Sequence, residues 1–129
     1  MLADAGYEIN SGVAGLPTAF VATLGDGPLV VGICAEFHAL PGIGHACGHN
    51  IIAGSAVAAA LALAPLVSRL GITVKVFGTP AEENGGAKAI MIDAGNSNVA
   101  AARRWDSSPP SSVLCLCSRI CRYRSRAWD

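Results

Sequence analysis

The chain has 129 residues, 52% of them hydrophobic and 14% charged, and its formal net charge at pH 7 is zero. This composition excludes a chain that is disordered throughout, and it predicts one ordinary globular domain. A net charge of zero gives no indication of a nucleic-acid partner, and we expect none.

The composition changes near Asn96. Residues 1–96 contain all 15 glycines and carry seven acidic against three basic side chains, whereas residues 97–129 carry two acidic against six basic ones. A change of this size marks a boundary. We therefore predict a folded domain over residues 1–96 and an irregular tail over residues 97–129.

The N-terminus and the cysteines predict a reduced, cytoplasmic protein. The first ten residues have neither the basic region nor the apolar core of a secretory signal, and the number of cysteines, five, is odd. Residues 51–67 are apolar but shorter than the roughly 20 residues that a membrane-spanning helix needs. We expect a buried helix there and no membrane partner; a small membrane protein is the alternative.

In chain order, the first elements predict a short helix end and a β-hairpin. Residues 2–7 look like the end of a helix, which Gly6 closes after barely one turn. Residues 18–24 and 29–37 are apolar and β-branched, and the Gly-Asp-Gly-Pro run between them is rich in turn residues, so we expect them to pair as a hairpin. The second run is apolar on both faces, which favours an interior strand.

The next segments alternate between helix and strand. We expect a helix over residues 50–70, with Asn50 as its N-cap and Gly71 as its stop, then a strand over residues 72–77 and a short helix over residues 87–94. This order predicts an α/β domain with a mostly parallel sheet flanked by helices. Ligands of such sheets bind beyond the carboxyl ends of the strands.

One candidate site follows the first long strand. Cys47 and His49 stand two residues apart in a glycine-broken loop, where a thiolate and an imidazole can converge on a transition metal, Zn²⁺ before Mn²⁺. The alternative is a buried structural cysteine beside a histidine that caps the helix. His45, flanked by Gly44, is typical of a solvated loop residue.

The second candidate is the pair Glu82 and Glu83, which follows the next strand. If the two side chains leave in opposite directions, one carboxylate can bind a metal ion while the other takes a proton from water. The alternative is a solvated turn at the start of a helix, where acidic side chains are favoured by the helix dipole.

The runs CAEFHALPGIGHACGHN and GITVKVFGTPAEENGGAKAIMIDAG resemble the amidohydrolase branch of the peptidase M20 metallopeptidases, which includes aminobenzoyl-glutamate hydrolases, N-acyl-amino-acid hydrolases and related dipeptidases. The resemblance covers roughly residues 1–95. It implies a phosphorylase/hydrolase-like zinc-peptidase catalytic domain. It also implies a homodimer held by a second, smaller domain that this chain lacks.

Carried over by motif, Cys47, His49 and Glu83 would be ligands of a divalent metal, Zn or Mn, and Glu82 would be the general base. The reaction implied is hydrolysis of the amide bond of an N-acyl amino acid, aminobenzoyl-glutamate or a dipeptide. Glu36, His38 and His45 are the candidates for orienting the ligands. Where relatives read AEYDALP, His38 replaces an aspartate, which removes a negative charge at pH 7.

The resemblance also implies further histidine ligands, yet no histidine follows His49. We therefore expect a truncated copy that carries part of the site and is inactive alone. The alternative is a non-enzymatic remnant, or a fragment that depends on a partner chain.

The tail contains Cys115, Cys117 and Cys121 among arginines. This spacing matches no zinc or iron–sulfur motif, and a basic nucleic-acid-binding arm is the functional alternative. We hypothesise that a shifted reading frame after about Asn96 explains the change in composition.

Overall fold

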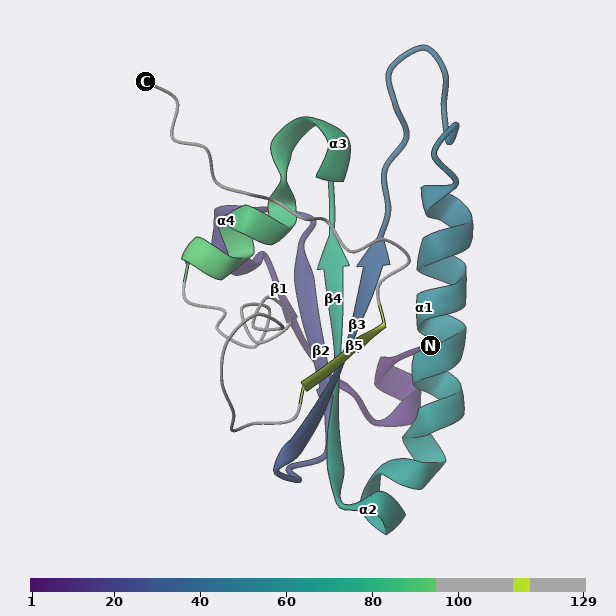
Figure 1. The fold of residues 1–129 in the computed structure, drawn as a ribbon, viewed down its shortest axis with the longest axis vertical. Coiled ribbons are helices and arrows are strands. Elements are labelled where there is room, and N and C mark those ends of the chain that lie inside the picture. Colours follow the sequence, from purple (N-terminus) through teal and green to yellow (C-terminus); the bar gives the residue numbers. More distant parts are fainter. Residues whose placement is uncertain (95–112, 117–129) are drawn as a thin grey trace.

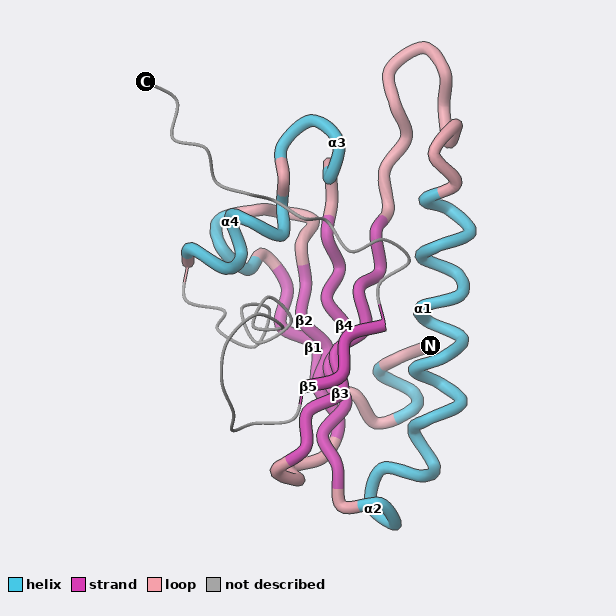
Figure 2. Tube along the Cα trace, viewed as in Figure 1, coloured by secondary structure: helices cyan, strands magenta, loops and turns pink. Residues whose placement is uncertain are grey.

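The computed structural model describes residues 1–94 and 113–116, and within them it shows an α/β fold with one five-stranded sheet (Figures 1 and 2). The order of the strands across the sheet is β1-β2-β4-β3-β5. The strands are β1 (Glu8–Ser11), β2 (Phe20–Leu24), β3 (Leu29–Glu36), β4 (Ile72–Thr79) and β5 (Val113–Leu116). The α-helices are α1 (His49–Leu63), α2 (Val67–Leu70), α3 (Glu82–Gly85) and α4 (Ala87–Asp93), with short 3₁₀ turns at Ala3–Ala5, Val13–Gly15 and Ala64–Leu66.

The sheet is mixed, so the prediction of a mostly parallel sheet is wrong. β3 pairs in parallel with β4 and β5, whereas β1 pairs antiparallel with β2 and β2 antiparallel with β4. The parallel part arises because the chain leaves β3, crosses through α1 and returns as β4 in the same direction. The two strands that precede this crossover add an antiparallel edge, as is common in α/β sheets.

The predicted hairpin is also wrong, because β4 lies between β2 and β3 (Figure 1). The turn between these two strands packs against the turn that begins β4: a Cβ atom on Gly27 would lie 1.9 Å from the carbonyl oxygen of Gly71. β4 therefore begins next to the turn that joins β2 and β3. β3 is nevertheless an interior strand as predicted, with β4 on one side and β5 on the other.

Helices cover both faces of the sheet, and a separate apolar core lies on each face (Figure 1). α1 contributes Ala56 and Ala60 to the core on one face, together with Val74 and Val76 of β4. On the other face, Phe77 of β4 packs with Met91 of α4. The alternation of side chains along β4 explains this division, because successive residues of a strand point to opposite faces.

The long apolar segment differs from the prediction at its start and in its burial. α1 begins at His49, and its N-cap is Gly48 rather than Asn50, while Gly71 ends α2 in the left-handed conformation as predicted. Only the side of α1 that faces the sheet is buried, and Ile51 on its outer side is 72% exposed. His49–Leu70 is the one stretch of the described chain that is long and apolar enough to span a membrane, a property that core helices share.

The N-terminal segment folds as a short 3₁₀ turn that ends at Gly6, in place of the predicted end of an α-helix. Of the predicted tail, the structure describes residues 113–116 as β5, and the rest of the tail lies outside the described residues. The tail cysteines therefore stay untested as a metal motif, and the boundary near Asn96 and the shifted reading frame stay predictions.

Candidate metal centre

The two candidate segments meet at one edge of the sheet, as the parallel arrangement predicts. β3 and β4 are parallel neighbours whose ends are level, since Glu36 is paired with Thr79. The loop that follows β3 leads to the start of α1, and α3 follows β4, so both segments lie beyond the carboxyl ends of these strands (Figure 1). Such ends are where α/β proteins bind ligands.

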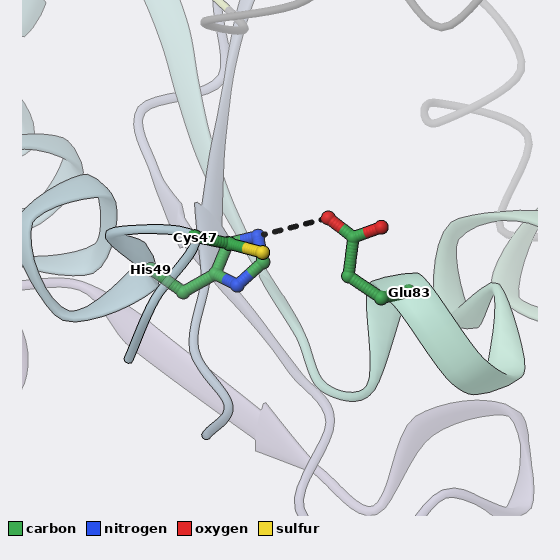
Figure 3. A group of neighbouring side chains, drawn as sticks. All are labelled: Cys47, His49 and Glu83. Atoms are coloured by element: carbon green, nitrogen blue, oxygen red, sulfur yellow. Dashed lines mark ion pairs between the residues drawn. The ribbon is translucent and has the colours of Figure 1, made fainter. Parts of the chain in front are cut away.

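Cys47, His49 and Glu83 converge there. One potential ligand atom from each residue lies within 4.8 Å of those of the other two. Figure 3 shows the thiol beside the imidazole, with the Glu83 carboxylate facing them from α3, and the His49 Nε2 to Glu83 Oε1 distance is 3.8 Å. His49 is buried, whereas Cys47 and Glu83 are exposed, so the group is anchored on one side and open to solvent on the other.

The structural alternative for Cys47 and His49 does not hold. Cys47 is exposed, so it is not a buried structural thiol, and no side chain caps the N-terminus of α1. His45 is exposed as well, and it does not belong to the converging group. The structure thus separates His49, which joins the group, from His45, which the loop leaves in solvent.

Glu36 and His38 both contact His49. The His49 Nε2 atom lies 3.1 Å from Glu36 Oε2, and the ring centroids of His38 and His49 are 4.1 Å apart. This Nε2 atom is the same ring nitrogen that faces Glu83, whereas the other nitrogen, Nδ1, is buried without a hydrogen-bond partner. Glu36 and His38 thus restrain the ring of His49 from two sides, and their predicted orienting role stays a prediction.

Buried polar atoms without a hydrogen-bond partner gather at this edge. In the described part of the chain such side-chain atoms are both ring nitrogens of His38, Nδ1 of His49, Oγ1 of Thr79 and Oε2 of Glu82. Each one costs about 1–3 kcal/mol if nothing binds it. Their concentration beside the thiol, imidazole and carboxylate fits a site that binds a divalent metal and a polar substrate.

The Glu82–Glu83 pair lies at the start of a helix, as its structural alternative expected, but only Glu83 is solvated. Glu82 is largely buried, and its Oε1 lies 3.3 Å from Nζ of Lys88. Ala81, which precedes the pair, has a positive φ of 51°. A left-handed conformation is strained for alanine, and such strain is characteristic of functional sites.

Sequence reasoning missed Lys88. Its Nζ lies 2.5 Å from Glu36 Oε1 as well as near Glu82, so it links two residues of the site. The signal that could have identified it is its place in the first turn of α4, where the helix dipole disfavours a cation.

Comparison with known proteins identifies the class. Residues 31–113 match the sequence model of peptidase family M20/M25/M40, and because this match covers most of the chain, the chain belongs to that family. The match extends past the change in composition near Asn96.

Individual relatives include two Xaa-Arg dipeptidases. The Mus musculus protein is 47% identical over 92 residues, which are 63% of this chain and 21% of the relative, and the Homo sapiens protein is 51% identical over 73 residues, 53% of this chain and 17% of the relative. A subunit of the p-aminobenzoyl-glutamate hydrolase of Escherichia coli (strain K12) is 33% identical over 124 residues, 81% of this chain and 26% of the relative. The chain thus spans about a fifth of the length of these curated relatives.

Proposed function

We propose that the chain carries the metal-binding part of an M20 amidohydrolase site, which hydrolyses the amide bond of a small N-acyl amino acid, aminobenzoyl-glutamate or dipeptide. The observation that carries this proposal is the convergence of Cys47, His49 and Glu83, while Glu82, the residue before Glu83, contacts Lys88. The relatives are named for a dipeptide and for an aminobenzoyl amide, which are both small amides.

Three protein ligands with one open position are the usual arrangement of a catalytic zinc site. Cys47, His49 and Glu83 would hold the ion, and the thiolate and imidazole favour Zn²⁺ over Mn²⁺. When bound, the ion supplies a Lewis acid that polarises the amide carbonyl and lowers the pKa of water. The openness of Cys47 and Glu83 to solvent gives a small substrate access to this position.

Glu82 is the proposed general base. Its carboxylate takes a proton from the attacking water and returns it to the leaving nitrogen of the amide. Lys88 holds one oxygen, Oε1, and the other, Oε2, is buried without a hydrogen-bond partner. That second oxygen is the proposed acceptor of the proton.

We propose that this chain binds metal but does not turn over substrate alone, in a reduced cytoplasm where Cys47 stays a thiol. A partner chain that completes the site is the second candidate, and two facts favour it: the outer face of α1 is apolar and exposed, and the Escherichia coli relative is named as one subunit of its enzyme. We propose neither a nucleic acid nor a membrane as that partner. Light scattering after chromatography measures partnership, and the cell fraction that retains the chain tests the membrane alternative.

Chelator competition with Zn²⁺ tests the metal site. We expect Cys47→Ser and His49→Ala each to weaken Zn²⁺ binding by at least the roughly 10–100-fold that losing a partner of a metal ligand costs. His45→Ala is the matched control, because it removes an exposed histidine from the same loop. A wild-type chain that retains no Zn²⁺, or a His45→Ala loss equal to that of His49→Ala, contradicts the proposal.

A further inference from the structure

Lys88 lies between two carboxylates of the site. Its Nζ is 2.5 Å from Glu36 Oε1 and 3.3 Å from Glu82 Oε1. The side chains of Lys88, Glu36 and Glu82 are 17%, 10% and 15% exposed, so these ion pairs are shielded from water. Shielded pairs are screened less by salt than surface pairs, and each partner depends on the other.

The helix itself does not explain this lysine. Lys88 is the second residue of α4, close to the positive end of the helix dipole, where a cation is disfavoured. Withdrawing an ammonium group from water costs several kcal/mol unless carboxylates compensate. The two glutamates compensate for both effects, so the position of Lys88 is determined by the site.

Glu82 and Glu83 are chemically identical, yet they face different partners. Glu82 Oε1 contacts Lys88, whereas Glu83 Oε1 faces His49 at 3.8 Å. Consecutive residues of a helix point about 100° apart. This angle separates the side chains of Glu82 and Glu83. It does not determine which of the two carboxylates faces Cys47 and His49.

We propose that Lys88 is the positioning residue that divides the roles of the two glutamates: it holds Glu82 outside the ligand group and leaves Glu83 to join Cys47 and His49. This inference rests on the proposed function and deepens it. Through Glu36, which also contacts His49, the same ammonium group ties the proposed base to the support of a proposed ligand.

The competing explanation is that Lys88 only fastens α4 to β3. The two explanations differ in what happens when Glu83 is lost. If Lys88 restrains Glu82, removing Lys88 releases a carboxylate next to the ligand group, and Glu82 can replace Glu83. If Lys88 only attaches α4 to β3, Glu83→Gln weakens Zn²⁺ binding by the same factor whether Lys88 is present or replaced.

The experiment measures the effect of Glu83→Gln on Zn²⁺ affinity in four backgrounds. In the wild-type chain, in Lys88→Arg and in Lys75→Met, we expect Glu83→Gln to weaken binding about 10–100-fold. In Lys88→Met we expect a loss of less than about threefold, and adding Glu82→Gln should restore the large loss. Lys75 is the matched control, because it is the only other lysine of the sequence.

Absorption of bound Co²⁺ gives a second readout, because its ligand-field bands report the number and kind of ligands. In Lys88→Met with Glu83→Gln the bands should resemble those of the wild-type chain, and they should change when Glu82→Gln is added. Should Lys88→Met lack a cooperative melting transition, Lys88→Gln takes its place, since its amide stays polar beside the two carboxylates but carries no positive charge.

An equal Glu83→Gln loss in the wild-type and Lys88→Met backgrounds overturns the inference. So does failure of Lys88→Arg to behave as the wild-type chain, because arginine retains the positive charge between the two carboxylates. A wild-type chain without Cys47-dependent Zn²⁺ binding contradicts the proposed function instead, so the two failures are distinguishable.

Discussion

Two neighbouring side chains restrain His49, the buried residue of the candidate metal site. His49 lies in a buried position between the Glu36 carboxylate and the His38 ring, so its orientation is set before any ligand arrives. Preorganisation of this kind reduces the free-energy cost of assembling a metal site. The motif around His49 was visible in the sequence, but its contact with Glu36 depends on how β3 and α1 pack together.

Tyr7 is the residue for which the structure predicts a pH dependence. Its hydroxyl donates a 2.8 Å hydrogen bond to the carbonyl of Ala60, and burial raises its pKa above the ordinary value of 10.0. The folded state therefore retains the proton more strongly than the unfolded state does. The stabilisation is complete below pH 10 and is lost as the pH rises through the folded-state pKa.

We expect Tyr7→Phe to lower the free energy of unfolding at pH 7 by about 1 kcal/mol, because one buried hydrogen bond is lost. Above pH 10 the difference in the free energy of unfolding between wild type and Tyr7→Phe should shrink, by at most about 1.4 kcal/mol per pH unit. Urea titrations from pH 7 to 11 measure both effects. A constant gap over this range would contradict the assignment.

At the scale of elements, two glycines predict opposite responses to alanine. A Cβ atom on Gly78 of β4 would lie 2.1 Å from the ring of Phe20, which stacks on Phe37 beside the site loop. Gly54 of α1 has nothing within 4 Å of its Cβ position. We expect Gly78→Ala to destabilise the fold by about 1–3 kcal/mol and Gly54→Ala to stabilise it by about 0.5–1 kcal/mol.

Chemical denaturation of both variants measures these differences. If Gly78→Ala were neutral, the close approach of β2 and β4 would be wrong. If Gly54→Ala were destabilising, a neighbour would have to cover the outer side of α1.

Elements that local residues encode were predictable, and the neighbours of each strand were not. The stop at Gly71 and the positions of β3, β4 and α4 follow from periodicity and from glycine chemistry. The hairpin failed because residues 25–28 show only that the chain turns. Whether β2 pairs with β3 or with β4 depends on contacts between segments that are distant in the sequence, and the close approach of Gly27 to Gly71 is one such contact.

The same distinction applies to the candidate site. Cys47, His49 and the two glutamates were found from residue types and family motifs, and the structure brings Cys47, His49 and Glu83 together. Lys88 was missed because a lone lysine in a short helix carries no motif. Its role becomes visible only when two carboxylates from other segments lie around its ammonium group.

For the whole molecule, a bound ion would join three segments. Cys47 belongs to the loop after β3, His49 to α1 and Glu83 to α3. Zn²⁺ at about 100 times its dissociation constant would stabilise the folded state by about 2.7 kcal/mol. For a domain of about 100 residues this corresponds to a rise in melting temperature of roughly 10–20 °C, taking about 4–8 °C per kcal/mol.

Thermal melting monitored by circular dichroism, with and without Zn²⁺, measures this rise. A chelator should reverse it, and His49→Ala should abolish it. The result that contradicts the prediction is an equal rise in the wild-type and His49→Ala chains.

The crossover through α1 also gives the site a place in the order of folding. The residues that would bind the ion stand before and after β4 in the sequence, more than 30 positions apart. Parallel pairing across such a connection forms slowly, because the entropy of closing the loop is lost before the contacts form. Co²⁺ would therefore gain its full set of ligands only after β4 has paired with β3. The rise of its ligand-field absorption during refolding would then report the rate of this pairing step.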